Sequence, residues 1–362
     1  MGVLQILTLI FSLIPIAATA ASILKRDEWW VRVFDFPRVQ IVFFNVLTLA
    51  GAAFVLSHDS IWPYILLATL IFSLIYQLMM IYPYTPLAEK QVVRYQGKSE
   101  KDIISIMVSN VLMTNDESDK LLALIKENNP DILLTLESNQ WWEDQLSSVE
   151  KDYPYTVKVP LENLYGMHLY SKLELDNAEV NYLVQDEIPS IQSNVTMRSG
   201  KKIRIYCLHP MPPSPTESDT STNRDAELLL VGKKISNNNK AVLVFGDLND
   251  VAWSRTTQLF QKLSGLLDPR VGRGFFSTFH AKYSLLRWPL DHVFHSSDFT
   301  LVEIKRLSEV GSDHFPIYAE LNYGPIAEVV QEEPDAETEE KVWAEEKIDK
   351  ANPVAIQVAR KY

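Results

Sequence analysis

The chain has 362 residues, of which 47% are hydrophobic and 22% are charged, and its formal net charge at pH 7 is −12. This length suits two domains, or one large domain with a smaller addition. The acidic balance argues against a protein that binds polyanions over a broad basic face. A single cysteine, Cys207, excludes an internal disulfide framework and a zinc site built on several thiolates.

The apolar residues are concentrated near the N-terminus, in three stretches without a charged side chain: Met1–Leu24, Val39–Ser57 and Ser60–Ala88. Each reaches the roughly 18–20 residues that a helix needs to cross a bilayer. The first stretch could instead be a cleavable signal peptide, because Ala17–Ala21 would suit a peptidase, but no positive charge precedes Lys25. We therefore predict a membrane region over residues 1–89 with three transmembrane helices.

The charges of the loops predict the orientation of these helices. Basic residues follow the first and third stretches, and none lies between the second and the third: Lys25, Arg26, Arg32 and Arg38, then Lys90, Arg94, Lys98 and Lys101. By the positive-inside rule, the first loop and everything after the third helix are cytoplasmic. In the loop 29–38, basic and aromatic residues alternate. It either pairs with anionic headgroups in the interface or is a plain connector.

Residues 90–325 have the composition of a globular domain. Apolar runs predict strands at 103–108, 132–136, 155–159, 167–170, 180–184, 203–208, 241–245, 292–295 and 317–321. Helical spacing of apolar residues predicts helices at 118–128, 224–235 and 253–263. Many strands with few helices predict an α/β (α+β) sandwich of packed mixed sheets with helices outside. The acidic residues 326–362 predict a disordered or loosely helical tail.

Polar side chains recur at the ends of the predicted strands: Asn110, Glu137, His209, Asp247, Asn249, Asp291, Asp313 and His314. Loops at strand ends are where a rigid sheet holds reactive groups in place. Each residue alone is more often an ordinary solvated terminus or turn. Together, oxygen ligands without a thiolate cluster suit a hard cation, Mg²⁺ before Mn²⁺. Such a cation polarises a phosphoryl oxygen.

Six short motifs carry these residues in a fixed order: Ser109-Asn110-Val111-Leu112, Leu136-Glu137-Ser138, Leu208-His209-Pro210, Gly246-Asp247-Leu248-Asn249-Asp250, Leu290-Asp291-His292-Val293-Phe294 and Gly311-Ser312-Asp313-His314-Phe315-Pro316. The series resembles the endonuclease/exonuclease/phosphatase superfamily (deoxyribonuclease-I-like fold) over roughly residues 102–322. The membrane region and its Trp-Trp…Phe-Asp-Phe-Pro-Arg loop are similar to the membrane-anchored bacterial branch of that superfamily. This similarity implies an integral protein of the bacterial inner membrane.

The resemblance implies a four-layer sandwich with two central mixed sheets, and a catalytic domain over residues 90–325. It also implies metal-dependent phosphoester hydrolysis by in-line attack of water. Glu137 would be the main metal ligand, with Asn110 beside it and Asp313 in support. The implied cofactor is Mg²⁺, with Mn²⁺ as the alternative.

The same resemblance implies catalytic roles. Asp247 would position and deprotonate the attacking water, and Asn249 would hold water or a phosphate oxygen. His209 would donate to a non-bridging oxygen. His314, oriented by Asp291, would stabilise the pentavalent phosphorus or act as acid–base. A carboxylate beside an imidazole fixes its tautomer and favours its protonated form. Whether Asp247 or His314 is the base stays open.

Four features near the predicted site are less defined. Tyr165 and Arg224 are candidates for contact with the substrate phosphate, and Arg224 also fits a solvated helix position. His168 stands where the family has a small or apolar residue, and it either faces the site or packs between the sheets. The proline-rich segment 210–222 predicts a flexible loop at the mouth of the site.

Three functions remain as hypotheses. The first is a membrane-bound hydrolase of a lipid-linked or small phosphoester, because tethering raises effective concentration at the bilayer. The second is a nuclease, which the acidic domain disfavours because duplex binding depends on lysine and arginine. The third is a non-catalytic membrane scaffold, which predicts loss of a core residue, and none of the named positions is lost. The sequence leaves the oligomeric state open.

Overall fold

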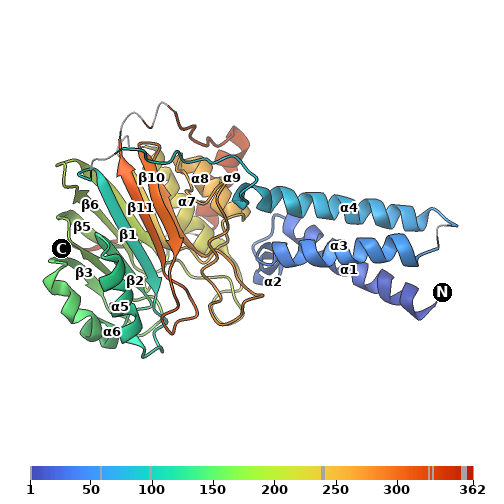
Figure 1. The fold of residues 1–362 in the computed structure, drawn as a ribbon, viewed down its shortest axis with the longest axis horizontal. Coiled ribbons are helices and arrows are strands. Elements are labelled where there is room, and N and C mark those ends of the chain that lie inside the picture. Colours follow the sequence, from blue (N-terminus) through green and yellow to red (C-terminus); the bar gives the residue numbers. More distant parts are fainter. Residues whose placement is uncertain are drawn as a thin grey trace. The chain divides into compact units, whose positions relative to one another are not determined.

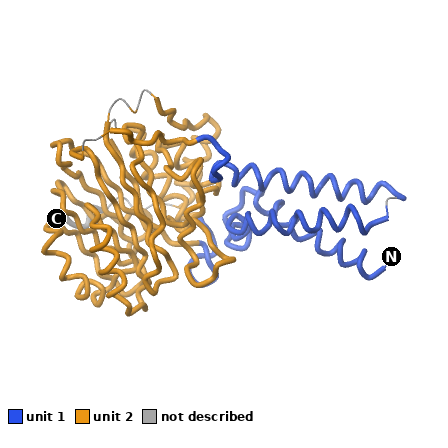
Figure 2. Tube along the Cα trace, in the orientation of Figure 1, with its two compact units in different colours: residues 1–89, 213–221 blue, residues 90–212, 222–362 orange. Residues whose placement is uncertain are grey.

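The computed structural model describes residues 2–57, 59–97, 100–237, 241–324, 327, 330–351 and 357–361. By packing, the chain divides into two compact units: residues 1–89 with 213–221, and residues 90–212 with 222–362 (Figure 2). The segment 213–221, predicted as a flexible loop, therefore packs with the first unit. There the amide of Ser221 donates to the carbonyl oxygen of Asp27 (2.7 Å), and that of Trp29 donates to Asp219 (2.9 Å).

The first unit is helical. Its elements are α1 (Val3–Ile23), α2 (Trp29–Arg32), η1 (Val33–Asp35), α3 (Arg38–Val55), α4 (Trp62–Ile81) and η2 (Tyr82–Tyr84). Among the described residues, three helical segments are long and apolar enough to cross a membrane: Val3–Ile23, Arg38–Val55 and Trp62–Tyr84. They coincide with the three predicted stretches.

Buried polar side chains connect the helices of this unit. Arg38 donates to Gln77 (2.9 Å) and to Asp35 (2.6 Å), and Gln77 donates to Thr19 (2.9 Å). Arg32 also pairs with Asp35 (3.2 Å), and both arginine side chains are at most 6% exposed. Two of the basic residues of the loop 29–38 therefore face inward and share the carboxylate of Asp35. This arrangement favours the connector over the headgroup-binding interpretation of the loop.

The second unit contains two six-stranded sheets (Figure 1). The first has the order β10-β11-β1-β2-β4-β3 and the second the order β12-β5-β6-β7-β8-β9. The strands are β1 (Ile103–Asn110), β2 (Ile132–Leu136), β3 (Tyr155–Val159), β4 (Met167–Ser171), β5 (Leu175–Tyr182), β6 (Ser190–Thr196), β7 (Lys202–Leu208), β8 (Val242–Asp247), β9 (Asp291–His295), β10 (Phe299–Arg306), β11 (Ile317–Tyr323) and β12 (Gln357–Lys361). Both sheets are mixed, because β1 runs parallel to β2 and β7 to β8, while the other pairs are antiparallel.

The central strands are apolar on both faces, because each sheet is covered on both sides. In β7, Ile205 and Cys207 belong to the core between the sheets, while Tyr206 and Leu208 belong to the core on the helix side. The same alternation holds in β1, where Ile106 faces the other sheet. This double burial explains why the sequence showed continuous apolar runs.

Helices cover the outer faces. They are α5 (Ser118–Asn128), α6 (Gln140–Gln145) and η3 (Leu146–Lys151) on the first sheet, and α7 (Thr222–Ser236) and α8 (Arg255–Ser264) on the second. Leu121 and Trp142 pack behind the first sheet, and Leu228 and Phe260 behind the second. The predicted four-layer α/β sandwich is confirmed.

The acidic tail was predicted as disordered or loosely helical, and residues Thr338–Ala351 form a helix, α9, that packs on the domain instead of being solvated. Ala344 and Ile348 of α9 are buried against Leu229 and Leu259. Lys347 reaches into the domain and donates to Asp225 of α7 (2.7 Å). Ala344 and Ile348 are four residues apart and therefore lie on one face of α9. Two apolar residues are too few to give a recognisable amphipathic pattern in an acidic sequence.

Candidate active site

The predicted site residues lie at one edge of the two packed sheets, because strand pairing places their strand ends together. Parallel pairing of β1 with β2 brings Asn110 opposite Leu136, the residue before Glu137. Asp247 at the end of β8 lies opposite Asp291 at the start of β9. Polar groups far apart in the sequence thus share one rigid edge.

Gly246 allows β7 and β8 to approach closely at this edge. Its φ is +148°, and a Cβ atom there would overlap the carbonyl oxygen of Leu208. Any other residue would push the two strands apart. Since His209 follows Leu208 and Asp247 follows Gly246, the glycine sets the distance between the two functional side chains.

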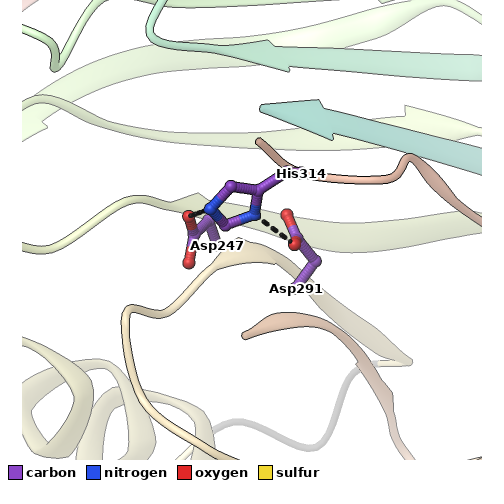
Figure 3. Close-up of side chains that lie close together, drawn as sticks. All are labelled: Asp247, Asp291 and His314. Carbon is purple, nitrogen blue, oxygen red and sulfur yellow. Dashed lines mark hydrogen bonds and ion pairs between the residues drawn. The ribbon is translucent and has the colours of Figure 1, made fainter. Parts of the chain in front are cut away.

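His314 lies between two buried carboxylates (Figure 3). Its Nδ1 donates to Asp291 Oδ2 at 2.8 Å, and its Nε2 lies 3.5 Å from Asp247 Oδ2. Asp291 is fully buried and His314 is 4% exposed. Burial alone would lower the pKa of His314, but the adjacent Asp291 and Asp247 outweigh it and raise the pKa to about 10. The imidazole is therefore a cation at neutral pH.

Asn110 connects the carboxylates of Glu137 and Asp247. Its Nδ2 donates to Glu137 Oε1 (2.8 Å) and to Asp247 Oδ2 (3.2 Å), while its Oδ1 accepts from the amide of Leu112 (3.1 Å). In this orientation the amide oxygen is engaged by the backbone. Asn110 therefore positions the two carboxylates, and only a rotation of its side chain would make it a direct metal ligand.

Glu137 is the best candidate for holding a cation. It adopts a left-handed backbone conformation with φ +59°, which is uncommon for a residue with a long side chain. Burial raises its pKa to about 7, and the negative charges of Asp313 and Asp247 add to this, against a hydrogen bond from Asn110 and the charge of His314. A carboxyl group whose pKa is raised beside other carboxylates lies in an environment that favours an added positive charge. The donor set fits a hard divalent cation.

A second group of possible metal ligands lies beside Glu137. Among the described residues, Asp247, Asp291 and His314 offer ligand atoms within 4.8 Å of one another. Because His314 Nδ1 already donates to Asp291, these two residues have the geometry of an oriented imidazole rather than of two free ligands. Asp247 is shared by both groupings and links the imidazole to the carboxylates.

His209 is a neutral donor on the same edge. It is 2% exposed, and its Nε2 lies 3.9 Å from Asp247 Oδ2. Burial lowers its pKa to about 4, although Asp247 acts in the opposite direction. The ring of Tyr165 packs on it with a centroid distance of 5.4 Å. Tyr165 also lines a cavity of about 380 Å³ next to the site, together with Asn163, Gln185, Ile188 and Met211.

Asn249 and Arg224 form one arrangement around the loop after β8. Asn249 has φ +50°, its amide donates to Asp247 Oδ1 (2.9 Å), and its side chain donates to the carbonyl oxygen of Pro210 (3.0 Å). Arg224 donates to the carbonyl oxygen of Asn249 (2.8 Å) from below the loop, and its side chain is fully buried. This placement corrects the expectation that Arg224 contacts substrate, because the guanidinium supports the loop from inside.

Charged residues that the sequence did not single out complete this support. Arg224 pairs with Asp225 (2.8 Å) and Asp250 (3.3 Å). His292 Nε2 lies 2.9 Å from the carbonyl oxygen of Asp250, and Arg270 contacts the other ring nitrogen (2.5 Å). Asp250 and His292 belong to two of the six motifs, but the sequence assigned them no role, and their place in those motifs was the only signal.

Asp313 and the hairpin of residues 279–288 lie next to His314. The carbonyl oxygen of Asp313 accepts from the amide of Ala281 (2.6 Å), and Thr278 accepts from the amide of Asp291 (3.2 Å). The ring of Phe279 lies 5.0 Å from that of His314. Asp313 was predicted, whereas Thr278, Phe279 and Ala281 were not, because these three reach the site only through the folding of a loop.

His168 lies away from the site. It is fully buried on β4, next to Tyr170, whose hydroxyl is 3.5 Å from its Nδ1. Tyr170 belongs to the core between the first sheet and its helices. His168 therefore packs on the helix side of the sheet, which neither of the two expectations described. Burial lowers its pKa to about 3.

Comparison with known proteins identifies the family. Residues 107–314 match the model of the endonuclease/exonuclease/phosphatase family. No curated protein sequence is significantly similar to the chain.

Solved structures resemble the fold at low sequence identity. The human Nocturnin catalytic domain with bound sulfate is 15% identical, with a TM-score of 0.52, and the match covers 66% of this chain and 97% of that one. Danio rerio TDP2 in complex with a single-strand DNA product is 17% identical (TM-score 0.50; 61% and 99% covered). An endonuclease/exonuclease/phosphatase protein from Beutenbergia cavernae is 15% identical (TM-score 0.50; 62% and 72% covered). Because the family model matches more than half of this chain, the chain belongs to the endonuclease/exonuclease/phosphatase family, whose members are hydrolases that act on phosphoesters.

Proposed function

We propose that this protein is a membrane-anchored, divalent-metal-dependent phosphoester hydrolase that uses water as the nucleophile. The carrying observation is the charged His314 held between Asp291 and Asp247, with Glu137 on the same edge of the sheets. One cationic donor and a group of carboxylates for a metal are what an anionic phosphoryl group requires. The candidate substrate is a lipid-linked or small phosphoester.

Each residue has a role in this proposal. Asp247 orients the attacking water and accepts its proton, since its carboxylate lies beside Asn110, His209 and His314. His314, charged and oriented by Asp291, donates to the phosphoryl oxygens as negative charge develops. His209 and Asn249 donate from the other side. Tyr165 positions His209 through the ring contact.

The residues present fit Mg²⁺, or Mn²⁺ in its place. Glu137 would hold the ion, with Asn110 positioning that carboxylate and Asp313 adding negative charge nearby. The bound ion would polarise a phosphoryl oxygen and offset the charge of the transition state.

Removal of the metal is expected to abolish hydrolysis. The full-length protein in detergent should hydrolyse bis(p-nitrophenyl) phosphate with Mg²⁺, lose the activity with EDTA, and regain it when Mg²⁺ is added in excess. Activity that persists after exhaustive chelation would contradict the metal-dependent mechanism. A substrate panel of phosphomonoesters, vesicle-borne lipid phosphates, and single-stranded and duplex DNA then identifies the substrate class, and exclusive cleavage of DNA would favour a nuclease.

We also propose that the catalytic unit lies on the cytoplasmic side of a bacterial inner membrane. The distribution of basic residues around the three candidate spans supports this orientation. A phosphatase reporter that works only outside the cytoplasm should be inactive when fused after Tyr362, while a fluorescent reporter that folds in the cytoplasm should be active there. The reverse pattern would refute the orientation and leave the chemistry of the site untouched.

A further inference from the structure

A hairpin next to the candidate site exposes large apolar side chains at its tip. Residues 279–288 fold back on themselves, with the amide of Phe279 donating to the carbonyl oxygen of Trp288 (3.0 Å) and that of His280 donating to Leu286 (3.0 Å). At the tip, Leu285 is 81% exposed, Tyr283 59% and Leu286 47%. An apolar tip held by a hydrogen-bonded base is unusual in water, where such side chains are normally buried.

The surrounding sequence is basic in a chain that is otherwise acidic. Residues 271–290 contain no aspartate or glutamate, while they contain Arg273, Lys282 and Arg287, in a protein of net charge −12. Lys282 is exposed directly beside the tip. Arg287 is half-buried and donates to the carbonyl oxygens of His280 and Ala281 within the hairpin, so Lys282 is the exposed cation at the tip. An apolar tip with an exposed cation beside it suits the boundary between the headgroups and acyl chains of an anionic bilayer, where a cation near the surface adds to the attraction.

The base of the hairpin is part of the wall of the site. The amide of Ala281 donates to the carbonyl oxygen of Asp313 (2.6 Å), and the amide of Phe315 donates to Thr278 (2.8 Å). The segment that carries His314 is thus fixed to the hairpin on both sides. Whatever surface receives the tip will also lie close to the catalytic imidazole.

We propose that the hairpin 279–288 inserts its tip into an anionic lipid bilayer and so presents the site to phosphoesters carried on lipid headgroups. This inference rests on the proposed function, whose substrate class it narrows. The two leucines at the tip favour a bilayer over single-stranded nucleic acid, because a base stacks on an aromatic ring, and of the three exposed apolar side chains only Tyr283 offers one. The three apolar helices of the same chain would keep the hairpin near a membrane.

Insertion can be measured without reference to activity. Cys207 is buried and is the only native cysteine, so Leu285→Cys can be labelled selectively with an environment-sensitive NBD dye on the full-length protein. In proteoliposomes of phosphatidylcholine and phosphatidylserine, lipids spin-labelled on the acyl chain should quench this dye. The same dye on Val342→Cys, an exposed apolar position on α9 (53%), should not be quenched. Equal quenching at both positions, or at neither, would overturn the inference.

Catalysis gives the second test. The Leu285→Asp/Leu286→Asp variant should lower the ratio of hydrolysis of vesicle-borne lipid phosphoester to that of bis(p-nitrophenyl) phosphate by at least about tenfold, and Val342→Asp should leave this ratio unchanged. An unchanged ratio in the hairpin variant, with the wild-type protein active on both substrates, would refute the inference while the proposed function stands. If the wild-type protein hydrolysed neither substrate, the proposed function would fail, and the quenching result would still decide insertion. Protection of the dye by single-stranded DNA but not by lipid would assign the tip to nucleic acid.

Discussion

Replacing His314 with alanine is expected to lower kcat by about 10³-fold, with a much smaller change in KM. The imidazolium is held between Asp291 and Asp247 and is the only one of the site histidines whose pKa is raised. A preorganised cationic donor acts mainly on the charge that develops in the transition state, and its removal costs about 10²–10⁴-fold in rate. The measurement is steady-state hydrolysis of bis(p-nitrophenyl) phosphate by the full-length protein at saturating Mg²⁺.

The Asp291→Asn variant tests how the imidazole is charged. Burial lowers the pKa of His314, and the two aspartates raise it, so loss of the Asp291 charge should move that pKa down by about 1–3 units. The protonated form is then lost at lower pH, and the alkaline limb of the kcat profile should move to lower pH in the same direction. As a matched control, Asp176→Asn removes a carboxylate from the exposed pair with Lys202 and should leave the profile unchanged. Full activity of His314→Ala, or an alkaline limb unmoved in Asp291→Asn, would contradict the assignment.

The sequence predicted the sandwich because its central strands are buried on both faces. Continuous apolar runs such as Ile132–Leu136 can be recognised without any tertiary contact, and their bounds agree with β2. Two strands within residues 90–325 were missed, of which β10 lies at a sheet edge and β6 lies third in its sheet. Phe299–Arg306 (β10) and Ser190–Thr196 (β6) mix polar and apolar residues, because one face of each is only half covered.

The site was predictable to the extent that it lies at strand ends. A residue directly after a strand is placed by the register of that strand, which is why Glu137 and Asp247 meet at one edge. The inward direction of Arg224 was not predictable, since it depends on α7 lying beneath the loop after β8. The docking of α9 through Lys347 likewise depends on a contact between residues more than a hundred positions apart.

Replacing Glu137 with glutamine is expected to weaken Mg²⁺ binding by at least about tenfold and to lower activity at limiting Mg²⁺ accordingly. The substitution keeps the size of the side chain and its contact with Asn110, and it removes the charge that would hold the ion. Mutation of a residue that supports or positions a metal ligand typically lowers the metal affinity by about 10–100-fold. High Mn²⁺, which binds such sites more tightly, should restore part of the activity, a rescue that a misfolded protein would not show.

The pH dependence of metal binding separates this role from a structural one. Burial raises the pKa of Glu137 to about 7, so below that pH a proton occupies the carboxylate and must leave before the ion binds. In the wild-type protein the apparent affinity for Mg²⁺ should therefore rise about tenfold per pH unit up to pH 7 and then level off. Glu137→Gln should abolish this dependence, whereas Glu127→Gln, on the exposed side of α5, should preserve it. A Glu137→Gln protein that retained the wild-type affinity and its pH dependence would show that another group holds the ion, and the Asp247–Asp291–His314 grouping would then be the next candidate.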